Sequence, residues 1–450
     1  MKMSGAKMVI ESLHQEGVEV VFGYPGGAIM NVYDEIYKQN YFEHILNRHE
    51  QACVIAAEGY ARSTGKTGVA IVTSGPGFTN AITGIADAYM DSIPVVIISG
   101  QVPTTIIGTD GFQEIDAVGI SRPCTKHNYL VNKIEDLPRI IKEAFHLAST
   151  GRPGPVHVDI PKDITAQIGE FIYPSEVNMP TYKPTLNYNK KQLKRAMEAI
   201  SNAKKPLLYI GGGAILSNCG YEIRDLAKKL NIPAVETLMA RGVMGDENPL
   251  FFGMLGMHGE YAANMAAHET DLLISLGARF DDRVTGRLDE FASKAKVIHI
   301  DIDPTSIAKL VVADYPIVGD LKLTVQAMIE DAENYEINDF SNWVELLKDY
   351  REKEPLRYID TDDLIKPQWP IQRVGKILGD NAIISTDVGQ HQMWTAQFFP
   401  FSYPRQWITS GGLGTMGFGL PAALGAARAF KGTNRVVVNF TGDGSILMNI

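Results

Sequence analysis

The sequence predicts an α/β protein of three doubly wound domains with mainly parallel sheets, the third of them incomplete. Short apolar runs alternate with helix-length segments along the whole chain, which is the pattern of repeated β-α-β units. The chain has 450 residues, more than a single hydrophobic core of ordinary size accommodates. Two proline-containing stretches interrupt the alternation and divide it into three blocks.

The expected strands are short runs rich in β-branched and apolar residues, as in parallel sheets that are buried on both faces. The last block offers only two of them before Ile450, fewer than a doubly wound sheet needs, so we expect a truncated chain. In chain order the expected strands lie at 18–22, 69–73, 95–99, 156–159, 206–210, 272–275, 297–301, 382–386 and 436–440.

Composition predicts the domain boundaries. A first domain at 1–170 is followed by a linker at 171–188 that is rich in proline, tyrosine and asparagine. A central domain at 189–335 is followed by a connection at 336–368, where we expect a helix and then an extended segment with prolines. The third domain covers 369–450.

The overall composition excludes several classes of protein. Hydrophobic residues make up 45% and charged residues 21%, as in soluble globular proteins, and no stretch approaches the roughly 18 consecutive apolar residues of a membrane span. The first residues lack a secretory signal, so we expect a cytoplasmic location and no membrane partner. The net charge is −10 with scattered basic residues, which argues against nucleic acid as a partner. Cys53, Cys124 and Cys219 are widely spaced and predict buried apolar side chains, without a disulfide framework or a zinc site.

Two motifs far apart in the sequence suggest a cofactor. Gly442-Asp443-Gly444-Ser445 follows the β-branched run 435–440, which predicts a glycine turn at the carboxyl end of a strand. Such glycines let a diphosphate approach the backbone, and Asp443 can hold the Mg²⁺ that accompanies it. Glu50, in Arg48-His49-Glu50-Gln51, follows the apolar run 42–46. Each motif alone has an ordinary reading, as a turn or a helix-capping glutamate, but together they suggest a thiamin diphosphate enzyme.

The order of further segments makes the resemblance specific. The chain resembles the large, catalytic subunit of acetohydroxyacid synthase, also called acetolactate synthase, over essentially all of its length. The segments that carry this resemblance lie at 22–28, 48–51, 59–62, 74–80, 108–114, 151–155, 279–286, 301–304 and 442–445.

The resemblance implies three domains of the thiamin diphosphate enzyme type and a carboligase reaction. Pyruvate is decarboxylated on thiamin diphosphate, and the hydroxyethyl unit condenses with pyruvate or 2-ketobutyrate on the route to valine, leucine and isoleucine. In the family, the glutamate matching Glu50 hydrogen-bonds the aminopyrimidine ring, which then removes the proton from the thiazolium carbon. The implied thiamin diphosphate contacts are Pro25, Glu50, Asn80, Gly389, Gln390, His391, Met416, Gly442, Asp443, Gly444 and Ser445.

Five further residues resemble catalytic, substrate-pocket or cofactor-contact residues of the family. Arg283 matches the residue near the acceptor's carboxylate, where a guanidinium makes a bidentate contact. Gln113 and Lys126 resemble residues of the substrate pocket and cofactor contacts, as does Phe112. Met416 resembles the large apolar residue that holds the cofactor in a bent conformation.

Three of these residues also have ordinary structural readings. Arg283 can be a solvated arginine paired with Asp281 or Asp282, and Lys126 a surface lysine. Met416 can fill a core.

In the central block, the expected strand 206–210 runs into Gly211-Gly212-Gly213, which suggests nucleotide binding. The G-x-G-x-x-G fingerprint is absent, and the acidic strand end at Asp301 comes far later than that fingerprint expects. Condensing two ketoacids transfers no net electrons, which puts a flavin in doubt chemically, but the segment 279–284 resembles the biosynthetic, FAD-containing type and not the fermentative type. The implied FAD contacts are Arg152, Gly211, Gly212, Gly213, Thr237, Leu238, Met239, His258, Gly277, Arg279, Asp281, Asp301, Ile302 and Asp320.

Magnesium is assigned to Asp443 alone. In the family a second ligand, an asparagine, follows after an intervening helix. Asn449 lies too close to Asp443 to receive that role, so we expect the chain as given to bind the cofactor poorly.

The resemblance also implies partners. Family architecture places Glu50 of one subunit opposite the Asp443 region of another, so a homodimer is the minimum unit, and a small regulatory subunit is a further expectation. Three alternatives remain: a pyruvate oxidase-like enzyme with thiamin diphosphate and flavin, a glyoxylate carboligase, and a noncatalytic relative with the same fold. Glu50 disfavours the carboligase, which lacks its equivalent.

Overall fold

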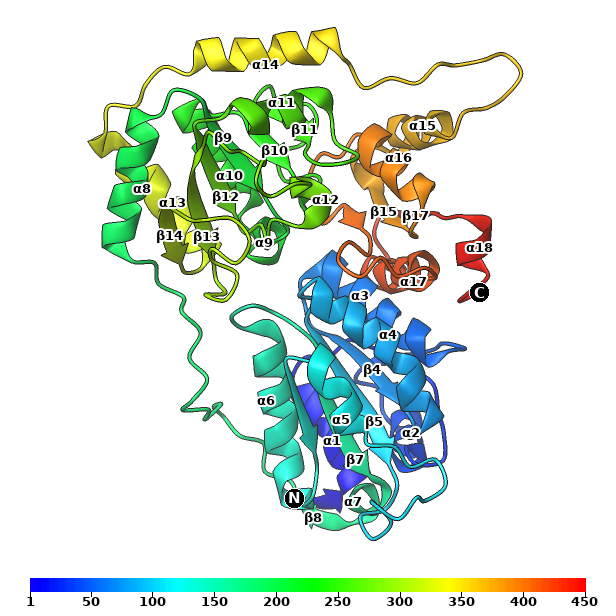
Figure 1. Ribbon diagram of the computed structural model, residues 1–450. Helices are drawn as coiled ribbons and strands as arrows, with labels where there is room; N and C mark the ends of the chain where they lie inside the picture. Colours follow the sequence, from blue (N-terminus) through cyan, green and yellow to red (C-terminus); the bar gives the residue numbers. More distant parts are fainter. The chain divides into compact units, whose positions relative to one another are not determined.

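The computed structural model describes residues 1–450, and the chain forms two compact units (Figure 1). The first unit contains Met1–Lys183, Ile384–Val388 and Ile408–Ile450. The second contains Pro184–Ile383 and Gly389–Trp407. The third predicted block is therefore shared between the two units.

The first unit is built on a six-stranded parallel sheet of order β3-β2-β4-β5-β7-β6. Its first strand, β2, has β3 on one side and β4 on the other, so the direction of winding reverses at β2. The strands are β2 (Val20–Gly23), β3 (Glu43–Leu46), β4 (Gly68–Val72), β5 (Val95–Gln101), β6 (His127–Leu130) and β7 (Val156–Pro161), with an antiparallel pair β1 (Lys2–Ser4) and β8 (Ile168–Glu170).

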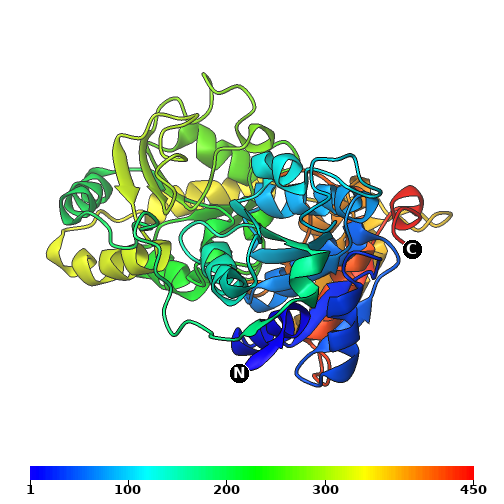
Figure 2. The same cartoon turned by 90° about the horizontal axis from the view of Figure 1, so that it is seen from below.

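Helices cover both faces of this sheet. One face packs valines and isoleucines against α1 (Gly5–Gln15), α2 (Met30–Lys38), α6 (Leu137–Ser149) and α7 (Lys162–Ala166). The side chain of Ser4 caps α1 by accepting a hydrogen bond from Lys7 N at 3.2 Å. Figure 2 shows the dark blue α1 from below. The other face carries α3 (Glu50–Thr64), α4 (Pro76–Met90) and α5 (Ala117–Ser121).

The second unit contains a six-stranded parallel sheet of order β11-β10-β9-β12-β13-β14. The direction of winding reverses between β9 and β12, and a large apolar core fills both faces. The strands are β9 (Pro206–Ile210), β10 (Ala234–Glu236), β11 (Phe251–Met254), β12 (Leu272–Leu276), β13 (Lys296–Asp301) and β14 (Tyr315–Val318). The helices are α8 (Lys190–Asn202), α9 (Gly213–Leu216), α10 (Gly220–Leu230), α11 (Tyr261–Glu269), α12 (Asp282–Thr285), α13 (Leu321–Asp331) and α14 (Ser341–Lys353).

The third predicted block holds a smaller sheet of order β16-β15-β17. Its strands are β15 (Ala382–Thr386), β16 (Trp407–Ile408) and β17 (Val436–Phe440), and its helices are α15 (Gln368–Leu378), α16 (Gln390–Phe398), α17 (Gly419–Ala429) and α18 (Asp443–Ile446). Five 3₁₀ turns complete the chain at Arg122–Cys124, Ile134–Asp136, Leu238–Ala240, Ala332–Asn334 and Gly379–Asn381.

Within the first unit, α17 packs directly on α3 (Figure 1). A Cβ on Gly59 would lie 2.1 Å from Ala422 O, and a Cβ on Gly425 would lie 1.9 Å from Ala56 O. Because Gly59 meets the start of α17 and Gly425 meets an earlier turn of α3, the two helices run antiparallel. Glycine is needed at both positions for the backbones to approach this closely.

The predicted α/β class with parallel sheets is confirmed, and the sheet of the third block is smaller than the two six-stranded sheets. The strands expected at 206–210, 382–386 and 436–440 have these bounds in the structure, and the other six were placed within two residues. The sequence did not predict β1, β6, β8, β10, β11, β14 and β16, which are short or carry polar residues and proline, and it indicated β3 only as the apolar run 42–46.

Two further expectations from the sequence concern the burial of the cysteines and membrane-spanning segments. Cys53 and Cys219 are buried as predicted, but Cys124 is only half-buried, so that expectation was wrong for it. No helix combines the length and apolar character that crossing a membrane requires.

Candidate active site

Glu50 lies at the carboxyl edge of the first sheet, next to the point where the winding reverses. It is the first residue of α3, directly after β3, and His49 caps the helix by accepting a hydrogen bond from Gln51 N at 3.2 Å. The Glu50 side chain is 7% exposed, and its Oε2 accepts a hydrogen bond from Asn80 Nδ2 at 3.0 Å. The structure therefore brings together two residues from the predicted cofactor set.

Glycines keep this edge open. A Cβ on Gly77 would lie 2.6 Å from Thr73 Cγ2 and 3.2 Å from Glu50 Oε1. A Cβ on Gly26, in the turn that contains Pro25, would lie 2.4 Å from the same Thr73 methyl. The turns after β2 and β4 thus meet beside Glu50, where ligands bind in open α/β sheets.

The edge also holds polar atoms without a partner. Thr73 Oγ1 and Asn47 Oδ1 are buried, and neither makes a hydrogen bond. Buried polar groups are normally satisfied, so these two atoms indicate a ligand or water at this edge. A polar ring bound against Glu50 fits this donor and acceptor set.

The loop at 102–116 reaches the same edge. Gln113 has a left-handed backbone, with φ of 59°, and its carbonyl lies 2.6 Å from where a Cβ on Gly75 would be. Gly75 itself has φ of +55° in the turn after β4. Phe112 is 89% exposed, so its ring is available to a ligand or a second chain. The structure thus places Gln113 against Gly75, two residues before the Gly77 that lies beside Glu50, and its role in the substrate pocket stays a prediction.

Lys126 is engaged inside the first unit. Its Nζ donates to Leu147 O at 2.5 Å, Thr150 O at 2.6 Å and Tyr182 Oη at 2.8 Å. Burial, followed by the charge of Arg152, lowers the pKa of Lys126 to about 8. All three ammonium hydrogens hold the end of α6 and the linker, so this geometry supports an anchoring role. A substrate contact stays a prediction.

The turn that contains Met416 is tied to the end of β15. The Asp387 carboxylate accepts hydrogen bonds from Gly417 N and Gly419 N, each at 2.9 Å. Met416 is 45% exposed, so it is not core filler in this chain. Gly389, Gln390 and His391 lie at the start of α16 and belong to the second unit, so the predicted diphosphate residues are divided between units.

Asp443 is exposed at the first position of α18, with Gly442 and Gly444 on either side. No group of three or more histidine, cysteine, aspartate or glutamate side chains could hold a metal ion in this chain. Asn449 Nδ2 donates to Gly417 O at 2.7 Å, so this amide is committed to the Met416 turn. Asp443 alone would supply one carboxylate to a metal that also binds phosphate oxygens.

Four buried charges in the first unit were missed by the sequence analysis. Arg62 on α3 donates to Asp91 at 2.9 Å, Glu58 at 3.1 Å and Asp87 at 3.3 Å. Burial, followed by the nearby Asp87 charge, raises the pKa of Glu58 well above its usual range. The spacing of the four residues on two helices was visible in the sequence, but no pattern connected the helices.

The same cluster holds the Met416 turn. Asp87 Oδ1 accepts a hydrogen bond from Thr415 Oγ1 at 2.6 Å, and also accepts one from Ser410 Oγ. Asp91 accepts from Gly411 N at 3.0 Å and Gly412 N at 2.8 Å. The turn is therefore fixed at the carboxyl-terminal halves of α3 and α4.

The carboxyl edge of the central sheet is also lined by glycines. A Cβ on Gly211 would lie 2.2 Å from Gly277 O, and a Cβ on Gly213 would lie 2.8 Å from Gly277 Cα. These residues follow β9 and β12, between which the winding reverses. Thr237 Oγ1 is buried there without a hydrogen-bond partner. A backbone cradle with an unsatisfied hydroxyl at this point fits a dinucleotide.

The other predicted FAD residues occupy several settings. Asp301 accepts a hydrogen bond from Asp303 N at 2.9 Å, and Asp320 caps α13 by accepting one from Leu323 N at 2.9 Å. His258 is exposed, and Arg279 is half-buried after β12. In the first unit, Arg152 Nε donates to Ser92 Oγ at 2.8 Å. The remaining predicted residues lie in the segments that follow β9, β10, β12 and β13; they are Gly212, Leu238, Met239, Asp281 and Ile302.

Arg283 lies on the short helix α12, which Asp281 caps by accepting a hydrogen bond from Arg283 N at 2.9 Å. Its side chain is 73% exposed, and its Nε lies 3.9 Å from an Asp282 oxygen. An ion pair with this exposure and this separation contributes little to the free energy of folding. The guanidinium is therefore accessible to an anionic ligand.

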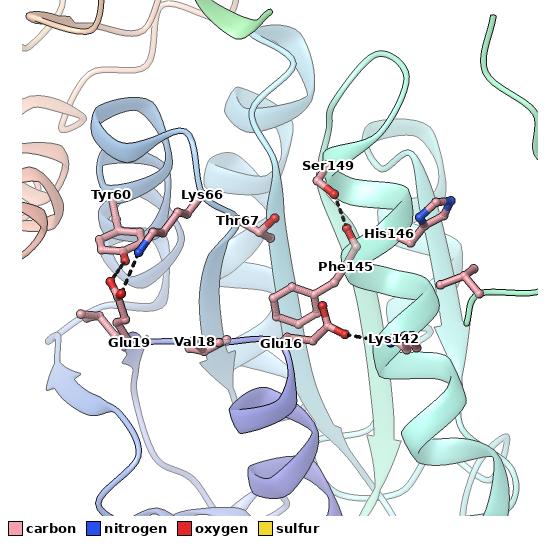
Figure 3. Close-up of a pocket in the computed structure, with 13 residues that line it drawn as sticks. Glu16, Val18, Glu19, Tyr60, Lys66, Thr67, Lys142, Phe145, His146 and Ser149 are labelled. Atoms are coloured by element: carbon pink, nitrogen blue, oxygen red, sulfur yellow. Dashed lines mark hydrogen bonds and ion pairs between the residues drawn. The ribbon is translucent and has the colours of Figure 1, made fainter. Parts of the chain in front are cut away.

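A pocket of the first unit lies elsewhere (Figure 3). It has a volume of about 510 Å³ and is lined at the amino edge of the sheet by residues around Val18 and Thr67. Its charges are paired: Lys66 Nζ lies 2.7 Å from Glu19, and Lys142 Nζ lies 3.9 Å from Glu16. It is at the opposite edge from Glu50, so we do not assign the chemistry to it.

Three domain families match the chain. Residues 3–120 match the thiamine pyrophosphate enzyme N-terminal TPP binding domain, 193–328 the central domain and 387–450 the C-terminal TPP binding domain. The acetolactate synthase large subunit of Haemophilus influenzae is 51% identical, over 100% of this chain and 79% of the relative. The chain belongs to the acetolactate synthase large-subunit family.

Other members of the acetolactate synthase family are similarly close. The isozyme 3 large subunit of Escherichia coli K12 is 49% identical, with 100% of this chain and 79% of the relative covered. A probable large subunit of Methanocaldococcus jannaschii is 47% identical over 99% of this chain and 77% of the relative. The three domain matches identify thiamin diphosphate, also called thiamine pyrophosphate, as the cofactor. The names of the relatives describe large subunits, which implies a smaller partner.

Proposed function

We propose that this chain decarboxylates pyruvate and joins the resulting two-carbon unit to a second pyruvate or to 2-ketobutyrate. The products would be acetolactate and acetohydroxybutyrate, precursors of the branched-chain amino acids. The observation that carries the proposal is the buried Glu50–Asn80 pair at the winding reversal of a sheet, in a chain about half identical to acetolactate synthases. When bound, thiamin diphosphate supplies the nucleophilic carbon and the electron sink.

Glu50 has a proton-transfer role in this proposal. Its Oε2 is held by Asn80, and Gly77 leaves space beside Oε1. A carboxyl group in this position would exchange a proton with a ring nitrogen of the bound cofactor. Burial of Glu50 keeps water away from this proton exchange. Exclusion of water also matters later in the reaction, because a proton from water would compete with the acceptor ketoacid for the two-carbon unit.

The acceptor is an anion and needs a cation. Arg283 is the predicted residue for its carboxylate, since the exposed guanidinium can make a bidentate contact. Gln113 and Phe112 would line the donor side near Glu50. Met416, exposed on its turn, would support the bent cofactor.

Two copies of the chain are needed to complete one site. Arg62 lies about 18 Å along α3 from Glu50, given the rise per residue of an α-helix. The Phe418 ring lies 5.3 Å from the Arg62 guanidinium carbon, so the turn before α17 is at that distant end. A Cβ on Gly419 would lie 2.6 Å from Asn439 Oδ1, which places the end of β17 there too.

Asp443 follows β17 directly, so Glu50 and Asp443 of one chain lie at opposite ends of α3. To contact both residues of one chain, a single cofactor would have to span the length of α3. This supports a homodimer with shared sites.

FAD and Mg²⁺ are further parts of the proposal. Gly211, Gly213 and Gly277, with the unsatisfied Thr237 hydroxyl, would hold the flavin nucleotide at the central sheet. Asp443 would be one ligand of Mg²⁺. The three predicted domains with boundaries at 170, 189, 335 and 369, a small regulatory subunit and a cytoplasmic location are also retained as proposals.

The test is acetolactate formation from pyruvate by the full-length protein, with thiamin diphosphate and Mg²⁺, before and after removal of FAD. We expect acetolactate, and loss of activity when FAD is removed, because the flavin would order the loops at the edge of the central sheet. Product that is independent of FAD would remove the flavin from the proposal. Flavin reduction by pyruvate without acetolactate would favour the pyruvate oxidase alternative, and absence of both would favour a noncatalytic relative.

A further inference from the structure

A polar network is buried inside the first sheet, in an otherwise apolar setting. Ser99 and Gln101 of β5 and His157 and Asp159 of β7 point to one face, since Ile97 pairs with His157 and Ser99 pairs with Asp159. All four side chains are at most 3% exposed. Their face is the one covered by α4, where the Phe78 ring stacks on His157 with centroids 4.3 Å apart.

Every member of the network has a partner. Ser99 Oγ donates to Asp159 Oδ1 at 2.5 Å and lies 2.7 Å from His157 Nε2. His157 Nδ1 lies 3.0 Å from Ser121 Oγ on α5. Burial lowers the pKa of His157 to about 3, so the ring is neutral, and Nε2–H donates to Ser99 while Nδ1 accepts from Ser121.

Gln101 connects this network to the loop at 102–116. Its Nε2 donates to Asp159 Oδ2 and to Ile115 O, each at 2.9 Å. Its Oε1 accepts from Val102 N at 2.9 Å. One side chain thus ties the first and the last part of the loop together, and Asp159 fixes its orientation.

Two further carboxylates, Asp163 on α7 and Glu114 within the loop, accept hydrogen bonds from the loop. Thr104 N and Oγ1 donate to Asp163 at 2.9 and 2.6 Å. The Glu114 carboxylate accepts from Gly111 N at 2.8 Å and also from Gly108 N. Asp163 on α7 thus holds the first part of the loop and Glu114 closes its last part, while Gln101 ties the two parts together. Gln113 leaves it with φ of 59° against Gly75, beside the Glu50 edge.

We propose that Gln101, oriented by Asp159, is a positioning residue that places Gln113 at the Glu50 edge. This inference rests on the proposed function, because Gln113 is taken as a residue of the substrate pocket. A loop that is not fixed at its ends shifts Gln113 relative to Glu50, and a misplacement of about 1 Å can cost on the order of 10²-fold in rate.

The test compares Gln101→Met with Gln39→Met. Gln39 is a matched control, since its amide also ties a short loop, donating to Phe42 O at 3.0 Å and accepting from Tyr41 N at 2.6 Å. For Gln101→Met we expect faster hydrogen–deuterium exchange at 102–116 and a kcat/KM for pyruvate lower by roughly 10- to 100-fold. Thiamin diphosphate affinity should be unchanged. Gln39→Met should alter none of these.

Two further variants separate positioning from folding. Gln101→Glu keeps the acceptor for Val102 N but loses the donors to Ile115 O and to Asp159 and places a second buried carboxyl group beside Asp159, so a loss at least as large as that of Gln101→Met is expected. Asp159→Asn keeps every partner once His157 takes its other neutral tautomer: the Asn amide donates to Ser99, Ser99 donates to His157 Nε2 and His157 Nδ1 donates to Ser121, while the Asn oxygen accepts from Gln101. We expect it to retain kcat/KM.

The proposal is overturned if exchange at 102–116 is unchanged in Gln101→Met, or if its kcat/KM equals that of Gln39→Met. An Asp159→Asn variant as impaired as Gln101→Met would also overturn it. If the unmodified protein makes no acetolactate, the proposed function fails, and hydrogen–deuterium exchange alone then decides whether Gln101 holds the loop.

Discussion

Replacing Glu50 with glutamine is expected to lower the rate of acetolactate formation by roughly 10² to 10⁴ fold, the usual contribution of a positioned proton-transfer group. Glutamine keeps the size of the side chain, and its oxygen can still accept a hydrogen bond from Asn80 Nδ2. In the unmodified protein this nitrogen lies 3.0 Å from Glu50 Oε2. It cannot exchange a proton with a bound ring. The initial rate at saturating pyruvate and thiamin diphosphate measures the effect.

Glu35→Gln is the matched control for this variant. Glu35 on α2 forms an exposed pair with Lys38 at 2.7 Å and lies outside the sheet edge that carries Glu50. We expect its activity to match the unmodified protein. Full activity in Glu50→Gln would remove Glu50 from the reaction, whatever the control shows.

Replacing Arg62 with methionine is expected to lower the free energy of unfolding by about 3–5 kcal/mol, the usual cost of removing one partner from a buried ion pair. The Arg62 side chain is 6% exposed, and those of its partners Glu58, Asp87 and Asp91 are 0% exposed. Without the guanidinium, three buried carboxyl groups have no cation. Urea denaturation measures the change.

The control for this variant is Arg139→Met. Arg139 also pairs with two carboxylates at 2.9 Å, those of Asp136 and Glu143, but its side chain is 49% exposed. Its loss should cost no more than about 1 kcal/mol. Equal effects of the two substitutions would show that the buried cluster does not depend on Arg62.

Local pattern was enough to predict most of the framework. Strands such as 206–210 and 436–440 are apolar runs next to glycine turns, and parallel sheets bury such runs on both faces. The place of Glu50 was predictable because it lies four residues after the apolar run 42–46 and begins a helix. Its contact with Asn80, which lies 30 residues later, depends on how α3 and α4 pack, and only the resemblance anticipated both residues.

Other features depend on contacts between distant segments. The buried charges of Arg62, Glu58, Asp87 and Asp91 look like ordinary surface residues of two helices until the helices are packed. The polar positions Ser99 and Asp159 interrupt apolar strands with a period of two, a visible signal of a shared polar face, but the sequence does not show which strands are neighbours.

The most direct test of the account is complementation between two inactive variants, Glu50→Ala and Asp443→Ala, expressed together. If each site takes Glu50 from one chain and Asp443 from the other, mixed dimers hold one complete site. Activity should then recover to about a quarter of that of the unmodified protein, since about half of randomly formed dimers are mixed. No recovery, although mixed dimers are isolated, would contradict the shared site.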